Sequence, residues 1–358
     1  MNRASPEGMT DQTTSIELGL DTFGDVTMDA DGRPKSQAQV LRDVVVEAQL
    51  ADKVGVDFIG LGEHHRPDFA ISAPDVVLAA VATRTDRIRL GTAVTVLSTD
   101  DPVRVYQRFS TLNAISNGRA EVILGRGSFT ESFPLFGYSL EDYDDLFEEK
   151  VAIFAAIRDA DVAGKPVHWK GTVRPPIEGI RVHPPVENPP LSVWVGVGGS
   201  PESVVRAARY RFPLTLAIIG GDPRRFVPYV ELYHRALDQL GAPKLPVGIH
   251  SPGHMAETDA QAREELWPAY QVMRNRIGAE RGWAPTSRAE FEHEVEAGSL
   301  YVGSPDTVAR KIAATVQALG ASRFDLKYSA GTLAHELMMK SIELYGREVM
   351  PRVRELIS

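Results

Sequence analysis

Short apolar runs alternate along the chain with longer segments in which apolar residues recur every three or four positions. The short runs are rich in Val, Ile and Leu on both faces, as in buried strands of a parallel sheet. The longer segments have the period of amphipathic helices. The predicted strands are 16–21, 57–62, 88–96, 120–126, 191–197, 214–219, 245–250 and 323–328. The predicted helices are 38–55, 102–116, 141–160, 201–210, 224–237 and 335–353.

Strands that alternate with crossover helices predict an α/β fold with a parallel sheet. Eight such units in a chain of 358 residues fit a TIM (β/α)8 barrel with insertions at its C-terminal face. A doubly wound open sheet is the competing architecture. We expect one barrel domain over residues 16–358, preceded by a polar, disordered leader over residues 1–15.

Two stretches exceed the minimal strand–helix unit. Residues 164–190 are rich in proline and predict a small hairpin. Residues 277–303 are polar and glycine-punctuated, and they precede an extra helix in which Ser304 is the N-cap and Pro305 the first helical residue. Long excursions of this kind usually form lids or pocket walls, although a passive surface insertion is equally compatible with either sequence.

Composition narrows the class of protein. The formal charge is −9 and the chain has no long Lys/Arg block, which argues against a nucleic-acid partner. The absence of cysteine excludes disulfides, thiolate nucleophiles and Cys–zinc sites. Residues 1–15 lack the apolar core of a secretory signal, and no run of about 18 apolar residues could span a membrane. We therefore expect a cytoplasmic protein.

The clearest candidate binding site is a helix start within 193–209, VWVGVGGSPESVVRAAR. A buried strand runs directly into Gly198 and Gly199, and Ser200 and Pro201 then suit the N-cap and first turn of a helix. Free N–H groups and the positive end of the helix dipole favour an anion there, and Ser203 could add a hydroxyl. A phosphate monoester fits this arrangement. The dinucleotide fingerprint is absent because Pro201 stands where it needs glycine, so a glycine-rich turn that merely starts a helix is the alternative.

Two further strand ends carry candidate ligand-binding residues. Arg126 lies between two glycines in VILGRGSF, where its guanidinium could converge on the same phosphate or simply pair with an acid. Ile218 and Ile219 in LAIIGGDP could form an apolar surface for a flat ring, or they could pack in the core.

The densest group of ionisable residues is GEHHRPDF, residues 62–69, directly after a predicted strand. Adjacent side chains of an extended segment point to opposite faces, so His64 and His65 are badly placed to chelate one metal ion. We expect one imidazole to face the barrel mouth for proton transfer near neutral pH, and the other to join a supporting network with Glu63, Arg66 or Asp68. Two purely structural histidines are the alternative, and no metal site is predicted.

Together these motifs resemble the bacterial luciferase-like family of flavin-dependent oxidoreductases. The resemblance covers roughly 16–352 and is strongest in LGEHHRPDF and in residues 87–138, where the GTAV strand, the DPVR helix start and the GRG strand end occur in order. VWVGVGGSPES and VGSPDTVARKI extend it. The chain looks most similar to the uncharacterised oxidoreductase branch of that family.

The resemblance implies a TIM barrel that binds FMN at its C-terminal mouth. It places a non-prolyl cis peptide near Ala93–Val94, under the flavin ring, and makes His64 the active-site histidine, supported by Glu63 and His65. The remaining cofactor-binding residues that it implies are Gly125, Arg126, Ser128, Gly198, Gly199, Ser200, Ser203 and Ile218. Light-emitting α chains carry cysteine at the position of Gly125 and an acid at that of Gly199, which argues against bioluminescence.

The implied activity is that of a two-component FMN-dependent monooxygenase. Reduced flavin would come from a separate reductase, and O2 would be used to oxygenate a small, rather apolar organic substrate. An FMN- or F420-dependent reductase or dehydrogenase, a non-catalytic flavin-binding protein and a metal-dependent barrel hydrolase are the alternatives. Family members commonly form homodimers through the helices near 74–84 and 102–116, and the second has Val103, Tyr106 and Phe109 as apolar residues for such a contact.

Overall fold

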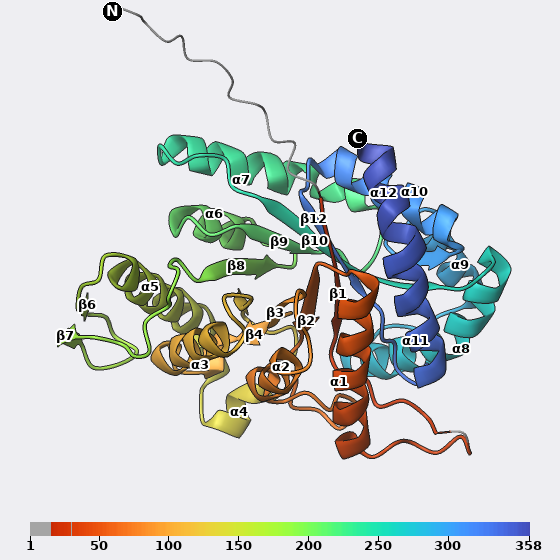
Figure 1. Cartoon of the computed structure of the whole chain (residues 1–358), viewed down its shortest axis with the longest axis horizontal. Coiled ribbons are helices and arrows are strands. Elements are labelled where there is room, and N and C mark those ends of the chain that lie inside the picture. Colours follow the sequence, from red (N-terminus) through yellow and green to blue (C-terminus); the bar gives the residue numbers. More distant parts are fainter. Residues whose placement is uncertain (1–15, 30) are drawn as a thin grey trace, which may run out of the picture.

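The strands of the protein form a closed parallel barrel that is surrounded by helices (Figure 1). The computed structural model describes residues 16–29 and 31–358, so the predicted leader over 1–15 lies outside the described residues. The barrel strands are β1 (Glu17–Thr22), β2 (Phe58–Leu61), β3 (Arg89–Thr92), β4 (Thr95–Val96), β5 (Glu121–Gly125), β8 (Ser192–Val197), β9 (Leu214–Ala217), β10 (Val247–Met255) and β12 (Arg323–Lys327).

Parallel pairing links the barrel strands in the order β3-β2-β1-β12-β10-β9-β8-β5-β4, in which β12 joins the two ends of the chain's strand sequence through β1 and β10. β3 and β4 are two segments of one predicted strand, which is interrupted at the cis peptide Ala93–Val94. β3 continues the pairing from β2, β4 pairs with β5, and a bridge between Leu90 and Ala120 joins β3 to the same strand. All eight predicted strands are therefore present, and the barrel replaces the open-sheet alternative.

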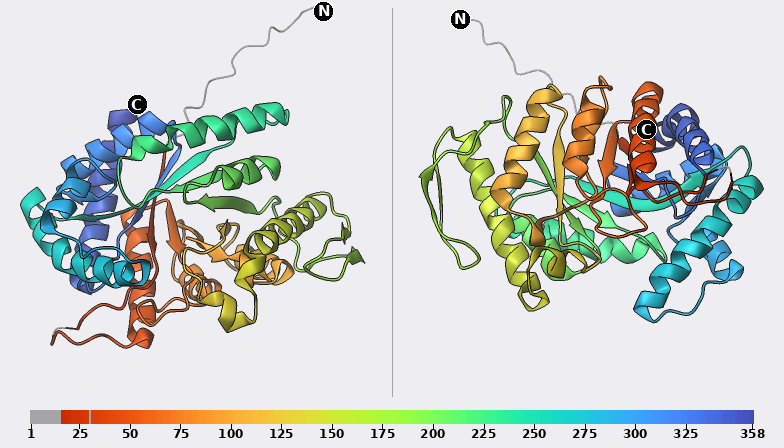
Figure 2. Two further views of the ribbon diagram at one scale, coloured as in Figure 1. Left: turned by 180° about the vertical axis from the view of Figure 1, so that it is seen from behind. Right: turned by 90° about the horizontal axis from the view of Figure 1, so that it is seen from below.

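Helices cover the outside of the barrel on all sides (Figure 2). They are α1 (Gln37–Val54), α2 (Pro74–Ala82), α3 (Pro102–Ile115), α4 (Ser132–Phe136), α5 (Tyr143–Val162), α6 (Pro201–Arg209), α7 (Val227–Gln239), α8 (Asp259–Arg281), α9 (Arg288–Glu296), α10 (Pro305–Leu319), α11 (His335–Leu344) and α12 (Met350–Ile357). Short 3-10 turns occur at Leu97–Thr99, Leu140–Asp142 and Pro223–Phe226, and a π-helical turn, Tyr345–Val349, joins α11 to α12. None of the helices in the described part of the chain is long and apolar enough to cross a bilayer.

The two long excursions have different places in the fold. Residues 164–190 contain the predicted hairpin, in which β6 (Val167–Trp169) pairs antiparallel with β7 (Ile177–Ile180). This hairpin lies in the connection from α5 to β8, at the edge of the molecule in Figure 1. Residues 277–303 follow β10 instead and contain the end of α8, all of α9, and β11 (Tyr301–Gly303), which pairs with β10. The side chain of Ser304 caps α10 as predicted, by accepting a hydrogen bond from the amide of Thr307.

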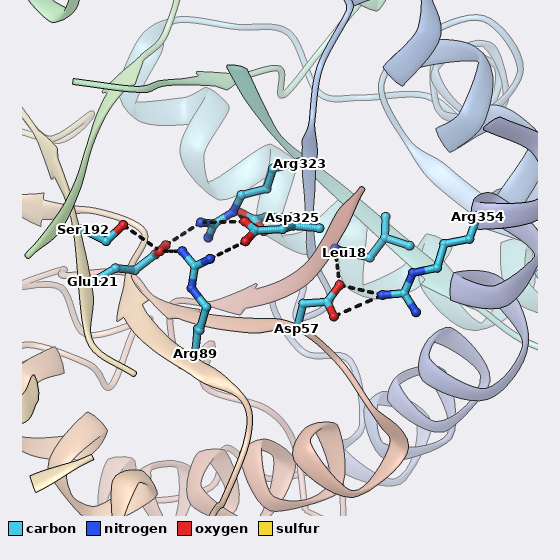
Figure 3. A network of polar contacts seen from close by, with 9 residues as sticks. Leu18, Asp57, Arg89, Glu121, Ser192, Arg323, Asp325 and Arg354 are labelled. Carbon is cyan, nitrogen blue, oxygen red and sulfur yellow. Dashed lines mark hydrogen bonds and ion pairs between the residues drawn. The ribbon is translucent and has the colours of Figure 1, made fainter. Parts of the chain in front are cut away.

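Charged side chains fill the barrel interior at the amino-terminal ends of the strands (Figure 3). Arg323 of β12 is fully buried and pairs with Glu121, which is also fully buried and belongs to β5 on the opposite side of the barrel. Glu121 is shared with Arg89 of β3, and Arg323 also donates to Asp325, with a distance of 2.8 Å from Nε to Oδ2. The Arg323 guanidinium lies 3.7 Å from the centre of the Phe58 ring. These contacts tie three separate strands together across the barrel.

Removal of the Arg323 charge should lower the free energy of unfolding. Arg323→Met leaves Glu121 and Asp325 buried without their shared cation, and breaking a buried ion pair in this way costs about 3–5 kcal/mol. The free energy of unfolding in urea measures the effect. The control is Arg310→Ala, which breaks an exposed pair with Asp306 within α10 and should cost no more than about 0.5 kcal/mol. Equal stability of the two variants would contradict the structural role of Arg323.

Candidate active site

A cavity of about 960 Å³ opens at the carboxyl-terminal ends of the barrel strands. Most of its wall is apolar, and its polar groups are gathered at a few points. Nine of the predicted site residues line it, namely Glu63, His64, Ala93, Val94, Gly125, Arg126, Ser128, Gly198 and Ser203. Four others do not, namely His65, Gly199, Ser200 and Ile218. The structure thus gathers most of the sequence-predicted site around one cavity.

The two adjacent histidines point in different directions, as their positions on an extended segment predict. His64 faces the cavity among three aromatic rings, with ring centroids 4.6 Å from Phe23, 4.7 Å from Phe69 and 5.3 Å from Phe129. His65 contacts Glu63 instead, with 3.0 Å between Nε2 and Oε1. Within residues 16–29 and 31–358, no three His, Asp or Glu side chains come together as a metal-binding group.

The expected near-neutral pKa of His64 is wrong. Burial among the aromatic rings lowers the pKa of this imidazole to about 3, and the positive charges of Lys327 and Arg66 also act against protonation. The carboxylate of Glu131 lies 4.0 Å from Nδ1, too far for a hydrogen bond to offset the burial. His64 is therefore a neutral imidazole at ordinary pH, and it can donate or accept one hydrogen bond but does not carry a charge.

Glu63 stabilises β4, which lies beside the cavity. One carboxylate oxygen accepts a hydrogen bond from the amide of Val96 at 2.8 Å, and the other contacts His65. The amide of Glu63 donates to the carbonyl of Val94 at 3.2 Å. Because both carboxylate oxygens are engaged, Glu63 and His65 support the segment around the Ala93–Val94 peptide, whose cis form is confirmed.

The structure refines the sequence interpretation at two positions, Ile218 and Gly125. Ile218 is completely buried in the core, and its neighbour Ile219 is the residue that lines the cavity. A Cβ atom added at Gly125 would collide with the side chain of Val94. The cysteine found here in light-emitting chains would therefore not fit beside Val94 without a shift of that side chain.

The N-terminus of α6 lies beside the cavity, which Gly198 and Ser203 line. Gly199 has a φ of 112°, a backbone conformation that favours glycine, and it leads into the N-terminus of α6. In the described part of the chain, the amides of Gly199 and Ser200 donate no hydrogen bond to another protein group. Ser200 caps the helix by accepting from the amide of Ser203, and its own hydroxyl donates to Glu202 at 2.8 Å. Free amides at a helix start provide a suitable cradle for a phosphate.

Two side chains from different elements reach the same end of the cavity. The hydroxyl of Ser203 accepts a hydrogen bond from the buried Arg206 at 3.2 Å, which leaves its own proton free to donate. Arg126 projects from the end of β5 and pairs with the exposed Asp144, 2.7 Å away. Both line the cavity, although the pairing of Arg126 also agrees with the alternative of an arginine held by an acid.

The excursion 277–303 forms a wall of the cavity, and the hairpin within 164–190 does not. Ile277, Arg281 and Trp283 all line the cavity, whereas none of the lining residues comes from the hairpin. Arg281 lies over the rings of both Phe129 and Trp283, at 5.2 Å from each centroid. The pocket-wall expectation is thus confirmed only for the excursion that follows a strand's carboxyl end.

Sequence reasoning missed a set of charged residues at the inner end of the cavity. They lie on β1, β10 and β12, which are neighbours in the barrel, and all line the cavity: Asp21, His250, Asp325 and Lys327. The signal was present, because each is an ionisable residue inside a predicted buried strand. Such residues are buried only when they are paired or functional.

Comparison with known proteins agrees with this geometry. The Luciferase-like monooxygenase family matches residues 22–323, so the chain belongs to this family of α/β barrel proteins. The uncharacterized protein y4wF of Sinorhizobium fredii is 30% identical over 193 residues, which are 50% of this chain and 56% of that protein. The alkanal monooxygenase alpha chain of Photorhabdus luminescens is 23% identical, over 89% of this chain and 93% of its own length.

Solved structures share the fold over nearly the whole chain. Monooxygenase RslO1 from Streptomyces bottropensis has a TM-score of 0.79 and 24% identity, and covers 94% of this chain and 99% of its own. The oxygenating constituent of 3,6-diketocamphane monooxygenase from Pseudomonas putida, in complex with FMN, has a TM-score of 0.77 and 20% identity, with 95% and 99% covered. An F420-dependent secondary alcohol dehydrogenase also has this fold, with a TM-score of 0.71 and 16% identity over 95% and 99% of the two chains.

Acid should destabilise the protein through His64. Because its pKa in the folded state is about 3 and that of an unfolded histidine is about 6.5, the unfolded chain binds more protons between these values. Stability is therefore lost as the pH falls below 6.5, by about 2 kcal/mol between pH 7 and pH 5 from this group alone. Urea unfolding of the wild type and of His64→Asn at several pH values measures the loss. An identical pH dependence of the two proteins would show that His64 is not buried as a neutral imidazole.

Proposed function

We propose that the protein is an FMN-dependent monooxygenase of the two-component kind. It would take reduced flavin from a separate reductase and use O2 to oxygenate a small, largely apolar organic molecule. The observation that carries this proposal is the cavity of about 960 Å³, which has a largely apolar wall and lies beside the N-terminus of α6. Membership of the luciferase-like family supports the same activity.

The residues present fit the phosphate of FMN. The unpaired amides of Gly199 and Ser200, the free hydroxyl proton of Ser203 and the cation of Arg126 are the groups that would hold it. A monoester phosphate carries up to two negative charges, and a helix N-terminus with one arginine is suited to bind it. Glu202 lies beside this end, but its carboxylate is exposed and engaged by Ser200.

Bound reduced flavin would supply the electrons with which O2 is activated, and the protein would supply the environment. The aromatic rings of Phe23, Phe69 and Phe129 exclude water from the space around His64. His64 would act as a neutral hydrogen-bonding group that orients a reacting oxygen. Glu63 would keep the Ala93–Val94 segment in place beside it.

Loss of the groups that would hold the phosphate should weaken the binding of FMN and leave the binding of riboflavin unchanged. Ser203→Ala and Arg126→Ala each remove a donor to a charged group, a contact worth about 1.5–3 kcal/mol, or roughly a 10- to 100-fold rise in Kd. Riboflavin has the same ring system without the phosphate. Fluorescence titration of both ligands makes the comparison, with Arg224→Ala as the control, because that exposed arginine pairs with Asp222 and does not line the cavity. If the wild type binds neither oxidised nor reduced FMN, the proposed function is wrong.

Replacement of His64 should separate binding from turnover. His64→Ala is expected to retain FMN and to lose oxygenation by about 10²-fold or more, the usual contribution of a positioned hydrogen-bonding group. Because the imidazole is neutral throughout, the loss should be similar at pH 6.5 and pH 8. Oxygen uptake with reduced flavin and candidate substrates provides the assay. Unchanged turnover would remove the role given to His64.

A reductase or dehydrogenase without oxygen insertion is a second candidate, favoured by the shared fold of the F420-dependent alcohol dehydrogenase. Product formation under strict anaerobiosis would distinguish it from a monooxygenase. The mass of the flavin that copurifies with the protein would distinguish FMN from F420.

We propose that the protein forms a homodimer through α2 and α3, but not through all the residues that the sequence indicated. Tyr106 and Phe109 are buried in the chain's own core, so they are not free for a partner. The exposed apolar residues of this face are Val76 and Ile115, which line a shallow groove between the two helices.

A further inference from the structure

Asp21 and His250 form a hydrogen-bonded pair at the inner end of the cavity. Asp21 lies near the end of β1 and His250 lies in β10, and 2.7 Å separate Oδ2 from Nδ1. Asp21 is fully buried, whereas the side chain of His250 retains 11% of its exposure and lines the cavity. A carboxylate behind an imidazole is thus directed at the same cavity that His64 faces.

The geometry leaves one ring nitrogen of His250 for a ligand. Nδ1 is held by Asp21, and within the described residues Nε2 has no hydrogen-bond partner. Phe23 stacks on the imidazole, with centroids 6.2 Å apart and planes at 14°, and so limits rotation of the ring. A ring held at Nδ1 by a carboxylate presents Nε2 as the nitrogen that exchanges a proton.

The two cavity histidines both lie near Phe23, but in opposite electrostatic environments. His64 has no carboxylate within hydrogen-bond distance, and its burial keeps it neutral. Burial also acts against the charge of His250, but Asp21 outweighs this effect and raises the pKa of His250 above its ordinary value. Two titratable groups of one type, driven apart by their surroundings, are typical of a divided catalytic role.

The other charged groups that face His250 have partners of their own and act on it in opposite directions. Lys327 and Asp325 approach it from β12, and Asp325 is opposite His250 in the strand register. Lys327 donates to Asp25 at 2.9 Å and to Ser329, and Asp325 accepts from Arg323. Asp21 therefore has His250 as its only side-chain partner, and its second oxygen, Oδ1, has no partner among the described residues.

We propose that Asp21 and His250 are an acid–base dyad in which Nε2 of His250 binds and protonates a substrate oxygen. The oxygen is one that develops negative charge during the reaction, as in an enolate or a polarised carbonyl. In the step itself the Nε2–H bond breaks and an O–H bond forms. The electron pair of the broken N–H bond stays on the imidazole. The imidazole remains hydrogen-bonded through Nδ1 to the ionised Asp21, and nothing is oxidised or reduced.

This assignment rests on the proposed function, because it names the part of the substrate that the cavity recognises. It also gives the two histidines different tasks. His250 handles a proton near neutral pH, and His64 contributes an uncharged hydrogen bond. The apolar wall strengthens both interactions, because hydrogen bonds to charge are worth more where water is excluded.

The test uses para-nitrophenol, whose phenol and phenolate forms differ in colour, with the flavin-free protein. The wild type should bind the phenolate preferentially, so that the bound probe ionises at a lower pH than the free probe. His250→Gln should reduce the ratio of bound phenolate to bound phenol about tenfold or more, which corresponds to about 1.4 kcal/mol. Asp21→Asn should also reduce this ratio, because loss of the carboxylate makes protonation of His250 less favourable.

His254→Gln is the matched control. His254 is on the same strand and is also paired with a carboxylate, Glu265 at 2.8 Å, but it does not line the cavity. Its replacement should leave the ratio unchanged. An equal ratio in the wild type and in His250→Gln, or absence of probe binding to the wild type, would overturn the dyad.

A measurement on the wild type alone covers the case in which the variants do not fold. Nitrogen NMR of the nine histidines should show at least two imidazoles that stay protonated above pH 6.5, because carboxylates raise the pKa of both His250 and His335. The imidazole of His64 should stay neutral well into acid. A spectrum with fewer than two imidazoles protonated above pH 6.5 contradicts the dyad. Because neither experiment contains flavin, failure here leaves the FMN titration intact, and failure of that titration leaves the dyad intact.

Discussion

The ion pair between Arg323 and Glu121 crosses the barrel and determines which end of it can hold a ligand. Both side chains are fully buried, so each depends on the other to remain charged inside the protein. Arg89 and Asp325 complete the cluster, and the Phe58 ring lies against the guanidinium. With the amino-terminal end of the barrel filled in this way, the cavity opens only where the strands end at their carboxyl termini, which is where TIM barrels carry their active sites. A partly exposed ion pair between Asp57 and Arg354 fastens the C-terminal helix α12 to the same end of the barrel.

Above this cluster, the polar groups of the cavity lie in three separate places. The helix start at α6, with Ser203 and Arg126, is positive and faces one end. The space around His64 is apolar and keeps that imidazole uncharged. The inner end holds His250, which Asp21 favours in its charged form. We propose that anion binding, a neutral hydrogen bond and proton transfer belong to these different places, because the surroundings of each group favour a different charge.

Much of this arrangement could be predicted from local sequence. Continuous Val/Ile/Leu runs identified every barrel strand, and Ser200 and Ser304 marked helix starts, because cap preferences depend only on neighbouring residues. The opposite directions of His64 and His65 followed from the alternation of side chains in an extended segment. Errors arose where the answer depended on packing. Ile218 and Ile219 are equally apolar, and only the barrel wall decides that Ile219 meets the cavity. Tyr106 and Phe109 belong to an apolar stripe of α3 that fits a partner surface equally well, and the chain's own core covers them.

The sequence by itself therefore determined the barrel, the phosphate-type helix start, the family and the histidine that faces the cavity, because these depend on periodicity and on short contiguous motifs. The tertiary structure alone decided the charge of that histidine, since its burial needs Phe23 and Phe129, which come from other segments, in addition to the nearby Phe69. It also brought Asp21 into contact with His250, which lies 229 residues further along the chain, and placed Lys327 beside the same cavity. Electrostatic environment is a property of what surrounds a group in space, and a one-dimensional pattern of apolar strands does not record it.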